Sequence, residues 1–110
     1  MTLFERIIAR EIPAKIVYED DDAIAFRDVS PQAPTHILVV PKRPLPKLSD
    51  ATDADALMLG RLLLTVNKVA ALEGLENFRV AINNGAGAGQ SVFHLHLHVL
   101  GGRSLSWPPG

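Results

Sequence analysis

Three histidines, His94, His96 and His98, alternate with apolar residues near the C-terminal end of this 110-residue chain. A period of two is typical of a β-strand, so residues 92–100 predict a strand with three imidazoles on one face and hydrophobes on the other. Alternate residues of a strand lie about 6.6 Å apart, because the rise is about 3.3 Å per residue. The three rings could therefore converge on one small ligand or one reacting atom.

A loop of small residues, residues 83–91, directly precedes the histidines and contains Gly85, Gly87 and Gly89. Small side chains let backbone N–H groups approach an anion closely. No Gly-Lys-Ser or Gly-Lys-Thr follows, as a Walker loop would require, and a simple turn is the alternative interpretation. Beside the histidines, the loop predicts a phosphate-binding site.

The histidines allow three interpretations: a nucleophilic site, a zinc site and a polar strand face without function. A neutral imidazole can act as a nucleophile at pH 7, because its free pKa is near 6.5. Two strand histidines together with His36 could instead supply three nitrogen ligands to zinc, with an open water position. No Asp or Glu lies within residues 92–100 to orient a ligand or to act as a base, but the residue types alone leave the zinc site open.

The composition favours one small globular domain over residues 1–110, since 47% of the residues are hydrophobic. Eleven basic and 12 acidic residues give a net charge of -1, which does not favour polymeric nucleic acid or an anionic membrane surface as a partner. Binding of a mononucleotide does not require a net positive charge.

There is no cysteine for a disulfide or a thiolate ligand, and no apolar run approaches about 18 residues. We expect a cytoplasmic protein.

Apolar spacing predicts a short helix after Thr2 and a long helix over residues 52–72, closed by Gly74. Together with five strands, these helices predict an α+β fold. The strands are expected at residues 15–19, 23–28, 35–40, 78–83 and 92–100.

The long helix carries two apolar stripes. The first should pack on the sheet and comprises Leu59, Leu62, Leu63, Val66 and Ala70. The second lies on nearly the opposite side and comprises Leu57, Leu64 and Ala71. Isolated surface leucines are normal, but this second stripe favours a homodimer through the long helix.

The sequence resembles the histidine-triad family, and within it the Hint branch of purine nucleoside phosphoramidases. The resemblance rests on residues 94–100, in which His alternates with hydrophobes, and on residues 11–15, 30–36, 89–92 and 101–110. It implies an α+β fold with a five-stranded antiparallel sheet, joined with the sheet of a second subunit through an edge strand into ten strands. It also implies hydrolysis of purine nucleoside 5'-phosphoramidates and acyl or aminoacyl nucleotides, with neither a metal nor another cofactor expected.

The resemblance also implies the catalytic residues. His96 corresponds to a nucleophile that attacks the α-phosphorus and forms a covalent nucleotidyl-histidine intermediate. His98 and His36 correspond to supporting histidines that orient it and move protons, and His94 to a further orienting residue. Ser91 corresponds to a hydroxyl that bonds the leaving-group nitrogen or a phosphoryl oxygen. From residue type alone, His36 could also be a buried core histidine and Ser91 a turn residue.

The nucleotide-binding residues follow from the same resemblance. Asp28 corresponds to a carboxylate that binds the ribose hydroxyls, although a carboxylate at a strand end can also be a turn residue. Asn83, Gly89 and Gln90 are expected at the phosphate, with Ser91, His96 and His98 beside them. The apolar contacts expected for the base are Ile7, Phe26, Val29 and Leu38.

Three positions depart from the usual Hint pattern. Asn84 stands where an acidic residue is common, Ala88 where glycine is expected, and Arg27 where a histidine often precedes the aspartate. Trp107 in the C-terminal tail agrees with the pattern, which places it near the partner subunit's site. Two other functions stay open: hydrolysis of dinucleoside polyphosphates by the same intermediate, and nucleotide binding without catalysis. The base and the physiological leaving group stay open as well.

Overall fold

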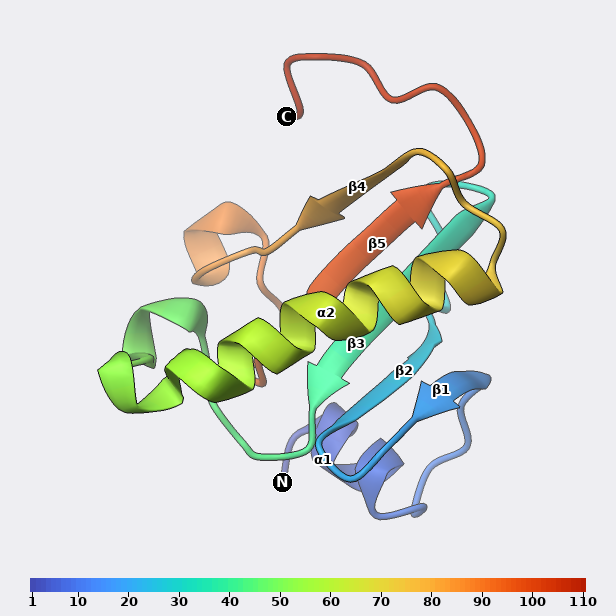
Figure 1. The fold of residues 1–110 in the computed structure, drawn as a ribbon. Helices are drawn as coiled ribbons and strands as arrows, with labels where there is room; N and C mark the ends of the chain where they lie inside the picture. Colours follow the sequence, from blue (N-terminus) through green and yellow to red (C-terminus); the bar gives the residue numbers. More distant parts are fainter.

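Five antiparallel strands form one sheet in the order β1-β2-β3-β5-β4 in the computed structural model, which describes residues 1–110 (Figure 1). This confirms the predicted α+β class. No helix combines the length and the apolar composition needed to cross a membrane. The strands are β1 (Ile16–Glu19), β2 (Ala23–Arg27), β3 (Thr35–Pro41), β4 (Phe78–Ala81) and β5 (Leu97–Gly101), and the helices are α1 (Leu3–Ile8) and α2 (Ala56–Leu72).

A capping box begins α1, and a second one begins the short turn that leads into α2. The Thr2 hydroxyl accepts a hydrogen bond from the Glu5 backbone N–H, and the Glu5 carboxylate accepts one from the Thr2 N–H, so two helix-terminal donors are satisfied. Thr52 and Asp55 form the same arrangement in a short 3-10 turn, Asp53–Asp55, directly before α2. The predicted long helix is therefore confirmed as α2 with a 3-10 entry.

The two faces of the sheet carry two separate hydrophobic clusters, as the period of two along β3 requires. Ile37 and Val39 belong to the larger cluster, which α2 covers, whereas Leu38 and Val40 belong to a smaller cluster covered by α1. His36 precedes this run by one residue and shares the face of Leu38. The catalytic candidates of β3 therefore lie on the sheet face opposite α2.

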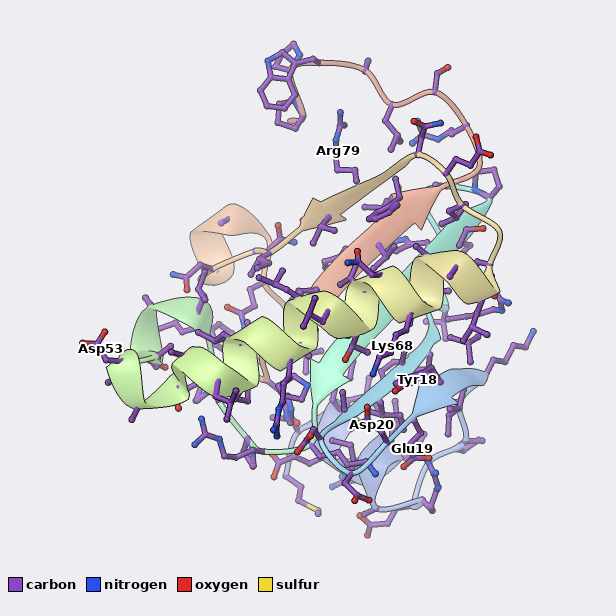
Figure 2. The ribbon with its side chains drawn as sticks, in the orientation of Figure 1. Tyr18, Glu19, Asp20, Asp53, Lys68 and Arg79 are labelled. Carbon is purple, nitrogen blue, oxygen red and sulfur yellow. The ribbon has the colours of Figure 1, made fainter.

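A polar contact joins α2 to the β1–β2 hairpin. The Tyr18 hydroxyl donates to the Asp20 carboxylate at 2.8 Å, and Lys68 of α2 donates to the Tyr18 oxygen at 3.4 Å (Figure 2). The Asp20 carboxylate also accepts from the backbone N–H groups of Asp22 and Ala23 in the turn. This contact fixes the acidic turn on the α2 side of the sheet, away from the histidines.

The predicted strand over residues 92–100 is wrong in its first half, because β5 begins at Leu97. The preceding segment is tied to a loop instead of a neighbouring strand: the Leu95 N–H donates to the Leu45 carbonyl, and the Gln90 side chain donates to the Val92 carbonyl. Of the three alternating histidines, only His98 lies in the ladder. The strand predicted over residues 78–83 ends early, at Ala81, which pairs with His98 near the start of β5.

The stripe of α2 that packs on the sheet excludes the predicted Leu63 and includes Thr65 and Val69, which were not predicted. Leu62 is 3% exposed, but Leu63 is 52% exposed, because neighbouring helix residues are rotated by about 100°. The buried residues of α2 are Leu62, Thr65, Val66, Val69 and Ala70. The second stripe faces solvent in the single chain, with Leu57 66% and Leu64 61% exposed.

Leu62→Ala and Leu63→Ala form a matched pair of variants that tests this packing. We expect Leu62→Ala to lower the free energy of unfolding by about 3 kcal/mol, since it leaves a cavity against the sheet. Leu63→Ala should lower it by less than about 1 kcal/mol, since little buried surface is lost. Urea denaturation of both variants measures the difference, and equal losses would contradict the packing described.

Candidate active site

Three of the four histidines converge on the sheet face opposite α2. His36 lies on β3 and His98 on the adjacent β5, where the antiparallel register pairs Leu38 with His98 and His36 with Leu100. The ring centroids of His36 and His98 are 5.1 Å apart, and those of His96 and His98 are 5.0 Å apart. The group that meets is therefore His36, His96 and His98, which differs from the expected convergence of the three motif histidines.

His94 turns away from this group into the protein interior. Its side chain is 1% exposed, and its ring Nε2 lies 2.7 Å from the Pro41 carbonyl oxygen, to which it donates. Its other ring nitrogen is buried without a hydrogen-bond partner. The His94 backbone carbonyl, in contrast, contacts the next histidine directly.

His96 is oriented by that carbonyl. Its ring Nδ1 lies 2.7 Å from the His94 carbonyl oxygen, and a carbonyl can only accept a hydrogen bond. The Nδ1 atom therefore carries the proton, and the Nε2 atom carries the free lone pair. The Phe4 ring packs against the His96 ring at 4.9 Å with an interplanar angle of 86°, so His96 is held on both sides.

His36 and His98 are joined by a direct hydrogen bond. The Nε2 atom of His36 lies 2.9 Å from Nδ1 of His98 and 3.4 Å from an Asp28 carboxylate oxygen. The other Asp28 oxygen accepts from the Ser30 N–H at 2.8 Å. His98 Nε2 is buried and has no hydrogen-bond partner, so one polar group of the site is left for a ligand.

All three converging histidines are shifted toward the neutral form. Burial lowers the pKa of His36 and of His96 below the ordinary value of 6.5, while the Asp28 carboxylate opposes part of the shift. Burial, together with the charges that His96 and His36 would carry, lowers the pKa of His98 to about 4. At pH 7 the site therefore presents uncharged imidazoles, as a nitrogen nucleophile requires.

Asp28, His36 and His98 also offer ligand atoms that all lie within 4.8 Å of one another, as in a metal site. Two imidazole nitrogens on a tetrahedral zinc ion would lie about 3.3 Å apart. The facing nitrogens of His36 and His98 are closer, at 2.9 Å, and share a hydrogen bond. The arrangement fits a proton relay better than a set of metal ligands.

The glycine-rich loop is organised by Gln90, which is 4% exposed. The side-chain oxygen of Gln90 accepts from the Gly85 N–H, and its NH2 group donates to the carbonyls of Pro46 and Val92. Gly85 and Gly89 have φ values of +92° and +96°, where a side chain would be strained. Gln90 was expected at the phosphate, but its amide is engaged in holding the loop.

The other predicted polar residues lie around this loop. Ser91, directly after Gln90, is exposed. Asn83 lies beside Gly89, since a Cβ atom on that glycine would be 3.7 Å from the Asn83 amide nitrogen. Both could therefore reach a phosphate placed at the loop.

The predicted base contacts divide into two groups. Ile7, Phe26 and Leu38 are each at most 6% exposed and belong to the α1 cluster, whose Phe4 packs on His96. Val29 is 98% exposed. Phe4 is a site residue that was not predicted, although its helical spacing with Ile7 places the two on one face of α1.

The three departures from the Hint pattern serve structural contacts. Arg27 makes two hydrogen bonds to Glu73, of 2.8 and 3.1 Å, and Asn84 accepts from the Ser49 N–H at 2.8 Å. Ala88 ends the short 3-10 turn Ala86–Ala88. Trp107 is 79% exposed, with the Arg79 guanidinium 5.9 Å from its ring centroid (Figure 2).

The sheet order and the histidines paired across β3 and β5 together define a histidine-triad domain. A family model described as the HIT domain matches residues 9–105, and the chain belongs to this family. It is 63% identical to an uncharacterized HIT-like protein of Synechocystis, over 99% of this chain and 96% of that protein. It is 51% identical to a protein of Arabidopsis thaliana named adenylylsulfatase HINT1, over 99% of this chain and 76% of that protein.

Solved structures agree with this assignment. A HIT family hydrolase from Legionella pneumophila superimposes with a TM-score of 0.97 at 46% identity, and all of both chains is covered. A histidine-triad protein from Clostridium difficile gives a TM-score of 0.91 at 42% identity, over 94% of this chain and 92% of that chain. The histidine-triad family and the five-stranded α+β fold expected for one subunit are confirmed.

Proposed function

We propose that this protein hydrolyses purine nucleoside 5'-phosphoramidates and acyl or aminoacyl nucleotides through a covalent intermediate on His96. The observation that carries the proposal is the hydrogen bond from His96 Nδ1 to the His94 carbonyl. It leaves the lone pair on Nε2, so the ring is prepared as a nucleophile without prior loss of a proton. A relationship to HIT family hydrolases supports the same reaction class.

The proposed reaction has two steps. In the first, His96 Nε2 attacks the α-phosphorus, the bond from phosphorus to the leaving nitrogen breaks with its electron pair, and His98 Nε2 supplies the proton that the amine takes up. In the second, water attacks the phosphorus, the bond to His96 breaks, and the electron pair returns to Nε2. The proton of the water goes to His98, which restores the resting enzyme.

The same proposal places the nucleotide. Backbone N–H groups of the loop around Gly89, with Asn83 and Ser91, contact the phosphate. Asp28 accepts hydrogen bonds from the ribose hydroxyls, and the α1 cluster with the exposed Val29 contacts the base. No metal or organic cofactor takes part in either step.

A comparison of two substrate classes tests the function. We expect kcat/KM for adenosine 5'-phosphoramidate to exceed that for a diadenosine polyphosphate by at least about tenfold, because a separate acid beside the nucleophile assists a basic amine most. A higher kcat/KM for the diadenosine polyphosphate would contradict the phosphoramidase and favour a dinucleoside polyphosphate hydrolase. Turnover of neither compound, with tight nucleotide binding, would favour the non-catalytic module.

Adenylyl sulfate is a second candidate substrate, because the Arabidopsis relative that is 51% identical carries the name adenylylsulfatase. Its leaving group, sulfate, departs as a stable anion and takes up no proton. Assay of sulfate release beside amine release from the same preparation determines whether this chain also accepts such a mixed anhydride.

The lowered pKa values predict a pH profile. His96 must be neutral to attack, and the groups facing it are His94, His98 and Asp28. Because burial lowers the pKa of His96 below 6.5, kcat/KM should stay level as the pH falls from 8 to about 6.5 and decline only below that value. A stopped assay across this range measures it, and a decline centred at or above pH 6.5 would contradict the assignment.

Folding stability should follow the same groups. In the unfolded chain these histidines bind protons near pH 6.5, whereas in the folded chain the pKa of His98 is about 4. The unfolded state therefore binds more protons within this window, and the free energy of unfolding falls as the pH falls through it.

A homodimer is also proposed. Leu57 and Leu64 are more than half exposed on α2, Ala71 continues their stripe, and β4 is an edge strand of the sheet. A second copy would cover the helix stripe and continue the sheet across β4 into ten strands.

Sedimentation velocity at micromolar concentration tests the dimer. We expect the wild-type chain to sediment as a dimer and Leu57→Glu/Leu64→Glu to sediment as a monomer, because two buried charges would face each other. Ile16→Glu, at an exposed apolar residue on the opposite edge strand β1, is the control that should stay dimeric. A monomeric wild-type chain would remove the dimer.

A further inference from the structure

The loop between β2 and β3 makes one contact with the site that the proposed mechanism does not use. The backbone N–H of Gln32 donates to the Nδ1 atom of His36 at 3.0 Å. A ring nitrogen that accepts a hydrogen bond carries no proton. The single proton of neutral His36 therefore lies on Nε2, on the side of the ring that faces His98.

The proton on His36 Nε2 also determines the tautomer of His98. His36 Nε2–H points at Nδ1 of His98 over 2.9 Å, so that Nδ1 must accept, and the proton of neutral His98 lies on its Nε2 atom. The opposite tautomer of His98 would set two N–H groups against each other at this distance. The Nε2 atom of His98 is the buried atom without a partner, and it is thus a hydrogen-bond donor.

We propose that Gln32 is a positioning residue whose backbone N–H sets the tautomers of His36 and His98, so that an N–H donor and not a lone pair faces the leaving group. The proposal rests on the proposed hydrolysis, because it assigns the direction of the proton that the first step requires. The positions of the protons on the Gln32 N–H, His36 and His98, in contrast, are a property of the protein without substrate.

The backbone of Gln32 is itself held in place. Arg103 of the C-terminal tail donates to the Gln32 carbonyl at 2.8 Å and to the Ser104 carbonyl at 2.9 Å. Within the loop, the Gln32 side chain donates to the Ser30 carbonyl at 3.0 Å. Prolines at positions 31 and 34 restrict the backbone further. Arg103 thus acts on the histidines through the backbone of Gln32, whose carbonyl it binds and whose N–H contacts His36.

Imidazole ¹⁵N NMR of the unmodified protein tests the proposal without turnover. We expect a protonated Nε2 and an unprotonated Nδ1 for both His36 and His98, and the reverse for His96. We also expect a scalar coupling across the N–H···N bond from the Gln32 amide to His36 Nδ1. A protonated Nδ1 on His36 or His98, or rapid exchange between tautomers, would overturn the proposal.

Two substitutions at position 32 form a matched pair. Gln32→Pro removes the N–H, whereas Gln32→Ala keeps it and removes only the contact to Ser30. We expect the wild-type tautomers in Gln32→Ala and mixed tautomers in Gln32→Pro, with phosphoramidate turnover at least about tenfold lower in Gln32→Pro than in Gln32→Ala, since a wrongly placed proton disables the acid. Equal turnover and equal spectra in the two variants would overturn the role of the N–H.

Arg103→Ala supplies a variant that leaves the loop sequence unchanged. Because it releases the Gln32 carbonyl, we expect broadened His36 and His98 resonances and a smaller loss of turnover than in Gln32→Pro, partly restored by Arg103→Lys. An unchanged spectrum would remove Arg103 from the proposal. If the expected tautomers are found but the protein does not hydrolyse phosphoramidates, only the proposed function is contradicted. If the protein hydrolyses them with other tautomers, only the role of the Gln32 N–H is contradicted.

Discussion

His96→Asn is expected to lower phosphoramidate turnover by at least about 10³-fold, while the affinity for the product nucleotide changes by no more than about threefold. Asparagine keeps a polar group of similar size, but it offers no nitrogen lone pair that can bond to phosphorus. Loss of a covalent nucleophile removes the whole two-step pathway. Single-turnover kinetics and titration calorimetry measure the two quantities on one preparation.

The covalent step can be observed and restored. A reaction of the unmodified protein quenched in alkali and analysed by mass spectrometry should show a nucleotidyl group on His96. In His96→Gly, added imidazole should restore part of the turnover, because the free ring can occupy the space left in front of the Phe4 ring. A fall of less than tenfold in His96→Asn, or an adduct on another residue, would contradict the assignment.

His98→Asn is expected to discriminate between leaving groups. With an alkylamine leaving group we expect turnover to fall by about 10³-fold, within the range of a lost general acid. With p-nitrophenolate, which departs without a proton, we expect a fall of less than about tenfold. The physical reason is that, in the proposed mechanism, the buried Nε2 atom of His98 supplies the proton that a departing amine needs.

The two substrates control for each other, since any general damage to the site lowers both rates alike. Steady-state assays with a series of nucleoside 5'-phosphoryl compounds of graded leaving-group pKa would show a steeper dependence in His98→Asn than in the wild-type protein. Parallel lines for the two proteins would mean that another group donates the proton.

The sheet, the two helices and their approximate bounds could be predicted from the sequence, because periods of two and of 3.6 are local properties of the chain. Capping residues such as Thr2 and Thr52 also act within one helical turn. Leu63 is a residue whose burial could not be predicted from the spacing of apolar residues. Its spacing allows it to lie on either edge of the apolar stripe, and only the position of the sheet leaves it exposed.

The strand predicted over residues 92–100 is a second case in which periodicity in the sequence did not predict the structure, here at the candidate active site. Alternation of His and hydrophobes satisfied the pattern of a strand throughout, but the Leu45 carbonyl and the Gln90 side chain bind the first half of this segment. Leu45 lies in the loop after β3, and Gln90 lies directly before the segment in the same connection between β4 and β5. Period alone therefore could not show that His94 points inward, away from the other two motif histidines.

By itself, the sequence determined that this protein is an α+β domain with alternating histidines beside a small-residue loop, since these features depend only on residue types and their spacing. Only the tertiary structure decided that His36 joins His96 and His98, because the pairing of β3 with β5 brings together residues that are distant along the chain. It also decided which nitrogens carry protons, because the backbone groups of His94 and Gln32 face those rings only after the chain has folded.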